Sequence, residues 1–385
     1  MINASAEGLF WLCAVCIAYT YAGYPLLMGL RARYRGRPLH PAGKFSGSVS
    51  IVLVVHNEGS SMDRRLGELT SLLAASARNG EILVVSDGST DHTVAKARAH
   101  ETKRVRVLEL PVNVGKAEAL TRGCAAATGD VLIFADARQR WAPDALEKIL
   151  FNFTVPEVGA VSGNLVIESA PGVMAGVGLY WRFEKWLRRM ESRVHSTVGA
   201  TGSISAVRRQ LFVPIPRGTL VDDVYWPLNV VMQGYRVVQD EGVIAYDRLP
   251  ERTHDEFQRK VRTLSGNYQL LVRLPAAVLP WRNPVWLEFI SHKIMRLLVP
   301  WALLGALFTS FVLPHPLYTG LFYLQGVFYS AGVAGILLGT RLSSRVTAAA
   351  GAFLVLNAAA WLAFWFWISG RTGKTWRKAR YAENP

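Results

Sequence analysis

Three short apolar runs in this sequence each lead into an acidic residue. The runs cover residues 51–55, 82–85 and 131–135, and they are followed by Glu58, Asp87 and Asp136. Continuous apolar runs of this length, bounded by polar turn residues, are typical of parallel strands covered by helices on both faces. Such sheets bind ligands beyond the carboxyl ends of their strands. We therefore expect these three acids, together with Asn57, to converge on one site.

Four other segments are long and apolar enough to cross a bilayer. The chain has 385 residues, of which 51% are hydrophobic and 18% are charged, and the four segments cover residues 8–30, 297–313, 317–340 and 346–369. A spanning helix needs roughly 20 apolar residues. The sequence therefore predicts an integral membrane protein that carries one soluble domain. Because no basic residue precedes the first segment, we expect an uncleaved anchor and not a signal peptide.

Basic residues next to these segments predict the topology. Four arginines follow the first segment, at positions 31, 33, 35 and 37. Because basic flanks stay in the cytoplasm, the N-terminus should lie outside and residues 31–296 inside. Three more spans would place the C-terminus outside, although the tail from 371 to 380 carries five basic residues. Either the tail is an exception to the charge rule or one C-terminal segment is re-entrant.

The net charge of +15 indicates anionic partners. The basic residues gather near apolar segments, which favours membrane headgroups and a phosphate-bearing substrate over nucleic acid. The three cysteines predict neither a disulfide framework nor a zinc site. Cys13 and Cys16 lie inside the first span, and Cys124 stands alone.

Strand and helix patterns alternate between residues 50 and 165, which predicts an α/β domain with a largely parallel sheet. Helices are expected at 66–73, at 89–99 with Ser89 or Thr90 as the N-cap, and at 116–124. Neither a dinucleotide fingerprint nor a P-loop is present. Residues 174–191 form an amphipathic pattern that suits either the membrane surface or packing on the domain. A second interface segment is expected at 281–292.

Several motifs occur in a characteristic order along the chain. They are Val55-His56-Asn57-Glu58, Ser86-Asp87-Gly88-Ser89, Asn113-Val114-Gly115-Lys116-Ala117, Asp136, Gly199-Ala200-Thr201-Gly202-Ser203, Asp222-Asp223 and Arg259-Lys260-Val261-Arg262-Thr263. This succession resembles the membrane-integrated family 2 glycosyltransferases, which include cellulose, chitin and hyaluronan synthases. The resemblance implies an N-terminal membrane helix at 1–30, a cytoplasmic GT-A domain with a Rossmann-like nucleotide-sugar site at 31–275, an interfacial segment with membrane helices at 276–370, and a basic tail at 371–385.

The resemblance also assigns residues to the sugar donor. Asp87 would accept a hydrogen bond from the base, and Asn57 and Glu58 would lie at the ribose or the base. Lys116 would reach the base or the diphosphate. The alternatives are that Asp87 caps a helix and that Lys116 is a solvated surface lysine.

Asp136 stands at the first acid of the place where the family usually has D-x-D, a motif that holds Mg²⁺ or Mn²⁺ against the diphosphate. Arg138 replaces the second acid. Arg138 could itself neutralise the diphosphate, Asp136 could still bind metal with help from elsewhere, such as His254, or Asp136 and Arg138 could form a salt bridge. Metal dependence therefore remains open at this stage.

On the acceptor side, the resemblance makes Asp223 the general base that takes the proton of the attacking hydroxyl. Asp222 would orient it or bind the acceptor, and Thr201, Gly202 and Ser203 would shape the acceptor pocket. The alternative is that both acids cap a helix.

The family's Q-x-x-R-W motif is degraded here. Arg259 and Arg262 take the glutamine and arginine places and could bind diphosphate or form part of a basic interfacial helix. Thr263 replaces the tryptophan, which weakens the case for a long polymer.

The resemblance implies an inverting transferase that moves a hexosyl or N-acetylhexosaminyl group from a nucleotide sugar, expected to be a UDP-sugar. The acceptor would be an exopolysaccharide or a lipid-linked glycan at the cytoplasmic face of a bacterial inner membrane. Expected partners are membrane lipids and either a second copy or an export protein, because four spans make a narrow conduit. The alternative is a catalytically inactive scaffold of a polysaccharide synthesis or export complex.

Overall fold

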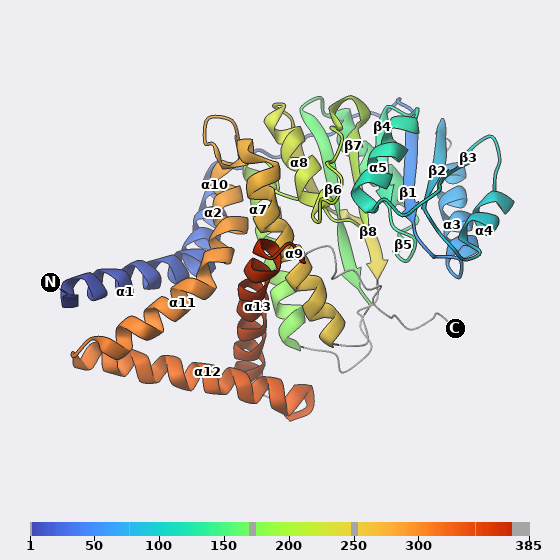
Figure 1. Cartoon of the computed structure of the whole chain (residues 1–385). Coiled ribbons are helices and arrows are strands. Elements are labelled where there is room, and N and C mark those ends of the chain that lie inside the picture. Colours follow the sequence, from blue (N-terminus) through green and yellow to red (C-terminus); the bar gives the residue numbers. More distant parts are fainter. Residues whose placement is uncertain (1, 77, 169–174, 248–252, 343, 372–385) are drawn as a thin grey trace.

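Eight strands form one mixed sheet in the order β3-β2-β1-β4-β7-β6-β8-β5 (Figure 1). The computed structural model describes residues 2–76, 78–168, 175–247, 253–342 and 344–371. The strands are β1 Val49–Val55, β2 Gly80–Asp87, β3 Val105–Leu110, β4 Val131–Ala135, β5 Arg140–Trp141, β6 Val158–Ile167, β7 Ile204–Arg208 and β8 Arg236–Asp247. The three predicted strands are β1, β2 and β4, and their apolar side chains are buried.

The sequence predicted a largely parallel sheet, and four of the seven described strand pairings are parallel. Strands β3, β2, β1 and β4 are parallel to one another, whereas β7 runs antiparallel to both β4 and β6. Strand β8 is parallel to β6, and the short β5 is antiparallel to β8. The sheet thus consists of a parallel half and a mixed half that meet where β4 pairs with β7.

Helices cover both faces of the sheet, as the continuous apolar strands require. One core contains side chains of α3 Met62–Ala75, α4 Thr93–Ala99 and α6 Ala145–Phe151. The opposite core contains side chains of α5 Lys116–Ala126 and α8 Asp222–Met232. Short 3₁₀ turns occur at Asn152–Thr154, Arg209–Leu211 and Pro275–Val278.

Helix α4 begins later than the sequence predicted, since His92 and not Ser89 or Thr90 stands at its N-cap position. The two expected capping residues contact the end of β1 instead. The Asn57 backbone N–H donates to Ser89 Oγ at 3.1 Å, and the Thr90 N–H donates to Asn57 Oδ1 at 2.7 Å.

Four helices are long and apolar enough to span a membrane, which confirms the number of spans that the sequence predicted. They cover Asn3–Tyr34, Trp286–Val312, Pro316–Leu337 and Val346–Ile368 in the described part of the chain. The first consists of α1 Ile2–Ala18, a π-helical turn at Tyr19–Gly23 and α2 Tyr24–Tyr34, and the second of α10 Trp286–Phe289, the π-helical turn η5 Ile290–Ile294 and α11 Met295–Val312. The others are α12 Pro316–Leu342 and α13 Arg345–Ile368.

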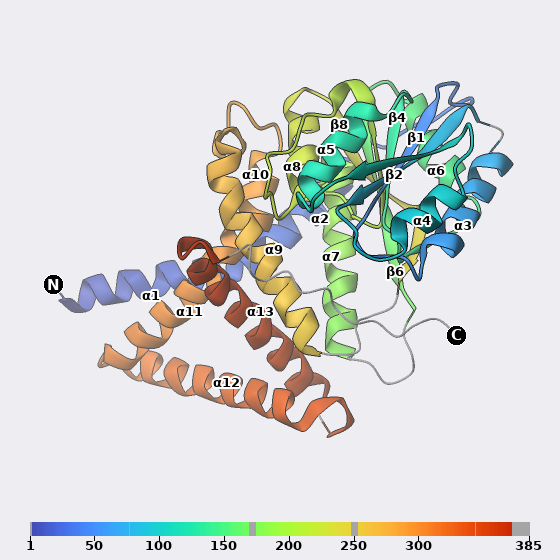
Figure 2. The ribbon, with the colours of Figure 1, turned by 45° about the vertical axis from the view of Figure 1, so that its right-hand side comes forward.

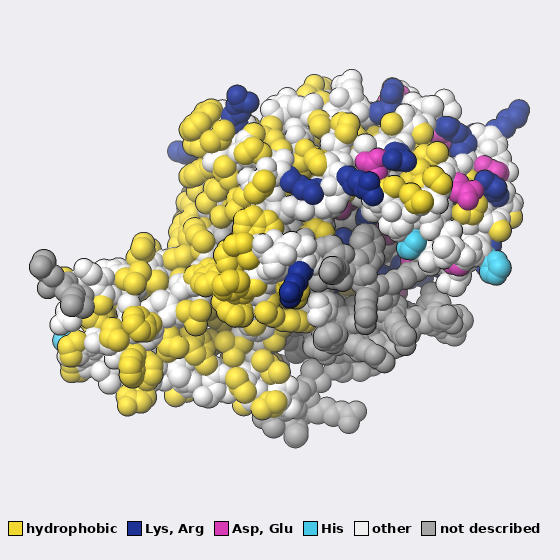
Figure 3. All heavy atoms as spheres, in the orientation of Figure 1, with side chains coloured by type: hydrophobic (Ala, Val, Ile, Leu, Met, Phe, Trp, Pro, Cys, Tyr) yellow, Lys and Arg dark blue, Asp and Glu magenta, His cyan; other side chains and the backbone are white. Residues whose placement is uncertain are grey.

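The second span begins about eleven residues before the predicted start at Leu297, because residues 286–292 of the expected interface segment are continuous with it. Hydrophobic side chains dominate the surface over the membrane helices, whereas charged side chains gather over the sheet domain (Figure 3). Of the predicted basic tail, only Arg371 lies within the described residues.

Two amphipathic helices, α7 Ala175–Val194 and α9 Thr253–Arg273, lie between the sheet and the membrane helices (Figure 2). Leu187 and Met190 of α7 are buried against Tyr24 and Met28 of α2. Within its described side chains, from 181 onward, the amphipathic pattern therefore belongs to a packed helix whose partner is the end of the first membrane helix. Helix α9 packs against α13 through residues such as Val261.

Candidate active site

A narrow pocket lies beyond the carboxyl end of β4, where the sequence predicted the ligand site. It brings together five of the predicted site residues: Lys116, Asp136, Gly202, Asp222 and Asp223. Its other lining residues are Val52, Val54, Leu120, Phe134, Ala135, Ser205 and Trp226. Residues on both sides of the β4–β7 contact therefore share one cavity.

Lys116 is the cation at the centre of this pocket. It begins α5, and its Nζ donates to Asp136 Oδ1 at 2.9 Å. Burial favours the neutral amine, but the negative charges of Asp136, Asp222 and Asp223 outweigh it and raise the pKa of Lys116. Lys116 is therefore positively charged and is not a solvated surface lysine. A Cβ added to Gly202 would lie 3.7 Å from this Nζ, so the glycine packs directly over the ion pair.

Asp222 and Asp223 open helix α8, where carboxylates are favoured by the helix dipole. The Asp223 carbonyl accepts a hydrogen bond from Ala200 N at 2.7 Å, which joins the α8 start to the 199–203 loop. Burial and the negative charge of Asp222 raise the pKa of Asp223 to about 6. The positive charges of Lys293, Arg188 and Lys116 oppose that rise. A carboxylate with this pKa is suited to accept a proton near neutral pH.

Asp87 ends β2 and is almost fully buried. Its Oδ1 accepts from Val114 N at 2.6 Å and its Oδ2 from Gly115 N at 2.9 Å. The carboxylate thus fixes the turn that presents Lys116, and among the described residues it makes no cap hydrogen bond to helix α5 itself. Each carboxylate oxygen has a second lone pair, so a role in binding the base stays a prediction.

The turn after β2 requires glycine. Gly88 has φ +60°, and a Cβ there would lie 2.3 Å from Asn113 N. Asn57 also has a positive φ, +53°, which asparagine tolerates better than most residues. The Glu58 N–H donates to Thr93 Oγ1 at 2.8 Å. Asn57 and Glu58 therefore lie at the end of β1, facing the turn that follows β2.

Two arginines of α3 hold the loop after β4, and the sequence analysis missed both. Arg65 is completely buried, stacks on Trp141, and donates from Nε to the Asp136 carbonyl at 3.0 Å. Arg64 donates from Nη2 to the Arg138 carbonyl at 3.0 Å. The signal in the sequence was an arginine within an otherwise apolar helical stripe. Such a position is buried, and charged residues are almost never buried without a partner.

Arg138 binds Asp247 at the end of β8. Its Nε and Nη2 donate to the two carboxylate oxygens at 2.9 and 2.7 Å, and Gln139 Nε2 donates to the same carboxylate at 3.0 Å. The bidentate geometry is the strong form of this interaction. The described ion pairs thus connect Asp136 to Lys116 and Arg138 to Asp247.

The described residues do not form a ready-made site for a divalent cation. Mg²⁺ and Mn²⁺ prefer several oxygen ligands, yet Asp136 has a lysine at 2.9 Å and Arg138 occupies the second position. No group of three or more His, Cys, Asp or Glu side chains with suitable geometry occurs among the residues described. The His254 side chain lies outside the described part of the chain.

The three predicted acceptor residues differ in their surroundings. Ser203 is buried, and its carbonyl accepts from Trp141 Nε1 at 3.0 Å, so it supports the loop. Thr201 Oγ1 contacts Ser203 Oγ at 2.8 Å, and the Thr201 N–H donates to Ser162 Oγ at 3.0 Å. Of the three, only Gly202 lines the pocket itself.

Arg259 and Arg262 lie in the first half of α9 and are not among the residues that line this pocket. The second half of α9 positions the loop that precedes α8. Gln269 Oε1 accepts from Leu220 N at 3.0 Å, and Arg273 Nη1 donates to the Arg217 carbonyl at 2.7 Å. Helix α9 therefore fixes the segment that leads into Asp222, while diphosphate binding by its two arginines stays a prediction.

Comparisons with known proteins fit this geometry. Residues 50–213 match the family model for glycosyl transferase family 2. The poly-beta-1,6-N-acetyl-D-glucosamine synthase of Staphylococcus aureus is 25% identical over 240 residues, which make up 58% of this chain and 56% of that protein. The corresponding synthase of Staphylococcus epidermidis is 24% identical over 242 residues. The match thus spans just over half the length of these curated relatives.

A solved structure supports the fold over nearly the whole chain. It is a mannosyltransferase from Pyrobaculum calidifontis in complex with GDP-Man and Mn²⁺, with a TM-score of 0.69 and 22% identity, and the match covers 94% of this chain and 99% of that one. The fold and the pocket therefore define a GT-A-like α/β domain joined to helices of membrane-spanning length. More particularly, residues 50–213 of this domain match the glycosyl transferase family 2 model.

Proposed function

We propose that this protein is an inverting glycosyltransferase that moves a sugar from a nucleotide donor to the hydroxyl group of a glycan or lipid-linked glycan. The observation that carries the proposal is the position of Asp223. Its carboxylate lines the same pocket as Lys116 and Asp136, and its pKa of about 6 suits proton transfer. The synthases of the two staphylococci support an N-acetylhexosamine as the first donor sugar to test.

In this reaction the acceptor hydroxyl oxygen bonds to the anomeric carbon while the bond from that carbon to the diphosphate breaks. Asp223 takes the hydroxyl proton. Lys116 neutralises charge that develops on the departing diphosphate, as a positioned cation does in a water-poor site. Asn57, Glu58 and Asp87 hold the nucleoside, and Asp222 and Gly202 bound the acceptor side.

A bound Mg²⁺ or Mn²⁺ would add positive charge to the diphosphate. The mannosyltransferase structure was solved with Mn²⁺, and the carboxylate here that stands at the corresponding family motif is Asp136. Because Lys116 already pairs with Asp136, we propose that the lysine provides most of the positive charge that neutralises the diphosphate. Arg138 acts indirectly, by holding the 136–138 loop to β8 through Asp247.

We place the sheet domain on the cytoplasmic side of a bacterial inner membrane, where nucleotide sugars are made. The support is the run of arginines at the end of the first span, among which Arg31 pairs with Glu288 at 3.0 Å. A second copy or an export partner would complete any path for a growing polymer.

The test is Asp223→Asn in the full chain, reconstituted in lipid with a panel of radiolabelled nucleotide sugars. Transfer should fall by about 10²–10⁴-fold because a general base is lost, while donor binding by calorimetry stays close to wild type. Asp144→Asn is the matched control, since Asp144 is an exposed acid at the start of α6 that pairs with Lys148.

Full transfer activity of Asp223→Asn would remove Asp223 from the mechanism. Binding of nucleotide sugar by the wild type without hydrolysis or transfer, with every donor in the panel, would favour the inactive scaffold. The inactive scaffold is the second candidate because Asp136 is occupied by an ion pair with Lys116.

A further inference from the structure

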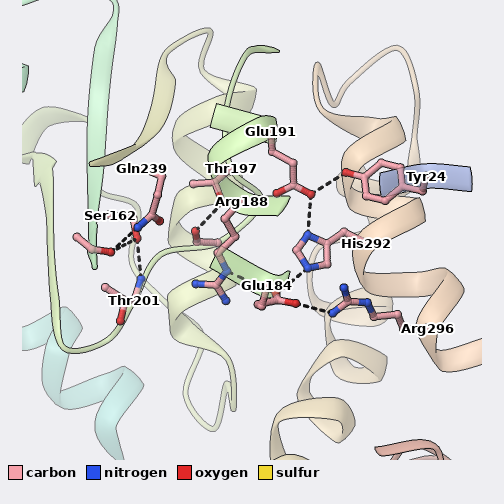
Figure 4. A network of polar contacts seen from close by, with 12 residues as sticks. Tyr24, Ser162, Glu184, Arg188, Glu191, Thr197, Thr201, Gln239, His292 and Arg296 are labelled. Carbon is pink, nitrogen blue, oxygen red and sulfur yellow. Dashed lines mark hydrogen bonds and ion pairs between the residues drawn. The ribbon is translucent and has the colours of Figure 1, made fainter. Parts of the chain in front are cut away.

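A buried polar network joins the sheet domain to two membrane helices (Figure 4). His292 of η5 lies between two glutamates of α7, with Nδ1 at 2.6 Å from Glu191 Oε1 and Nε2 at 2.7 Å from Glu184 Oε1. The Tyr24 hydroxyl of α2 donates to the same Glu191 oxygen at 2.6 Å. Arg296 Nη1 donates to Glu184 Oε2 at 2.8 Å. His292 and Glu191 are almost completely inaccessible.

The two carboxylate contacts of the His292 imidazole restrict which of its ring nitrogens carry a proton. A neutral ring has one donor and one acceptor nitrogen, so hydrogen bonds from both nitrogens to carboxylates need a proton on each. Buried charges are costly unless each is paired. Burial opposes ionisation of Glu184, but the positive charges of Arg296, His292 and Arg188 outweigh it and hold its pKa well below the usual range.

Arg188 connects this network to the active site. It lies one turn after Glu184 on α7, and its Nε is 3.5 Å from Glu184 Oε1, the oxygen that His292 also contacts. In Figure 4 the Arg188 side chain lies between Glu184 and the segment that carries Thr197 and Thr201. That segment leads into Gly202 of the pocket. Arg188 is thus the member of the network nearest to the acceptor side.

Arg188 therefore brings positive charge from this junction to the segment that contacts Asp223, where Ala200 N donates to the Asp223 carbonyl at 2.7 Å. Arg188 comes from α7, and Lys293, which follows His292 directly, comes from η5. Both favour the ionised form of Asp223. His292 joins η5 to α7 through Glu184, and Arg188 contacts the same Glu184 oxygen.

We propose that His292 is a positioning residue for transfer: by binding Glu184 and Glu191 it holds Arg188 at the segment that leads to Gly202 and contacts Asp223 on the acceptor side. This inference rests on the proposed function of Asp223. The cluster is then part of the transfer machinery and is more than a brace between domain and membrane helices.

The charged and titratable groups around the two centres come from several elements. Those around Asp223 are Asp222 of α8, Lys116 of α5, Arg188 of α7 and Lys293 of η5. Those that contact His292 directly are Glu184 and Glu191 of α7, and the same cluster includes Tyr24 of α2, Arg188 of α7 and Arg296 of α11.

The test compares His292→Gln with Arg31→Gln in the full chain in lipid. The control removes the Arg31–Glu288 ion pair, which joins α2 to α10 at the same junction without touching Arg188. The titration of Asp223 is followed by its infrared carboxyl band, assigned with Asp223→Asn, and transfer is measured against pH. The double variant Glu191→Gln with His292→Gln removes one charge of each sign and serves if His292→Gln alone fails to fold.

In His292→Gln, the midpoint of the Asp223 titration and the acid limb of kcat should move to higher pH, since Arg188, whose charge favours the carboxylate, is no longer held. At pH 6 kcat should fall about tenfold, with donor affinity unchanged. Arg31→Gln should move neither readout.

An unchanged Asp223 midpoint in folded His292→Gln and in the double variant would overturn the proposal and leave a structural brace. The infrared measurement needs no substrate, so this failure is distinguishable from a failure of the proposed function, which would appear as absent transfer by the wild type.

Discussion

At the scale of single residues, the properties of the site follow from the charged side chains that share one small pocket. Asp222 and Asp223 are adjacent acids at a helix start, and Lys116 lies within reach of both and of Asp136. Two half-buried, adjacent carboxylates repel each other when both are ionised, so desolvation and this repulsion shift the pKa of Asp223 upward. The same arrangement that suits Asp223 for proton transfer should therefore weaken the folded state.

This cost predicts a pH-dependent stability difference for Asp223→Asn. The pKa is about 6 in the folded protein and about 3.9 in an unfolded chain. Between these values the folded state binds more protons, so stability falls as pH rises through the window and stays lower above it. At pH 7 the variant should be more stable than wild type by on the order of 2 kcal/mol, and the gain should vanish near pH 4.

Thermal unfolding in detergent at both pH values, with the exposed-acid variant Asp144→Asn as the control, measures the effect. A lower Tm for Asp223→Asn at pH 7 would contradict it.

At the scale of elements, the apolar pattern of the chain predicted β1, β2 and β4 and four membrane helices, because burial acts through local periodicity. It did not predict the polar connections between elements. Arg138 binds an acid 109 residues away, and His292 binds glutamates 101 and 108 residues away. No local signal in the sequence selects one such partner among 28 acids. The motif order included five of the residues that line the pocket, while the contacts that orient them depend on the three-dimensional arrangement.

The loop between β4 and β5 yields a prediction about metal. Since Lys116 pairs with Asp136 and Arg138 is bound to Asp247, the diphosphate should be neutralised mainly by the lysine. Lys116→Ala should lower kcat/KM by at least about 10²-fold, and treatment of the wild type with EDTA should lower it far less. Arg138→Ala should have an intermediate effect, because it loosens the loop and leaves Asp247 without this cation.

Turnover with EDTA, with and without added Mn²⁺, decides between these roles. Complete loss of wild-type activity in EDTA that Mn²⁺ restores would make this a metal enzyme with Asp136 as a ligand.

At the scale of the whole molecule, α7 and α9 separate the sheet from the membrane helices, and the charged surface lies on the sheet side (Figure 3). Arg31 and the arginines that follow it stand at the junction between the first span and the sheet domain. Basic residues at such a junction keep the adjoining domain in the cytoplasm. The site and the pool of nucleotide sugars would then lie on the same side.

A single cysteine at Ser46, in a variant whose three native cysteines are replaced, tests this orientation. Ser46 lies in the segment between the first span and β1. An impermeant thiol reagent should label it in inverted vesicles and leave it unlabelled in intact cells, and the reagent should label a permeabilised sample fully. Labelling in intact cells would place the domain outside and refute the topology.

The contact between β4 and β7 divides the pocket along the chain as well as in space. Most residues proposed for the donor, from Asn57 to Arg138, precede those proposed for the acceptor, from Thr201 to Asp223, whereas Arg259 and Arg262 follow them. The proposed specificity for the two substrates would therefore be encoded largely in separate stretches of the gene. Recombination between related genes near codon 136 could pair a new donor preference with an old acceptor preference in one step, and chimaeras joined there are a direct route to transferases with altered products.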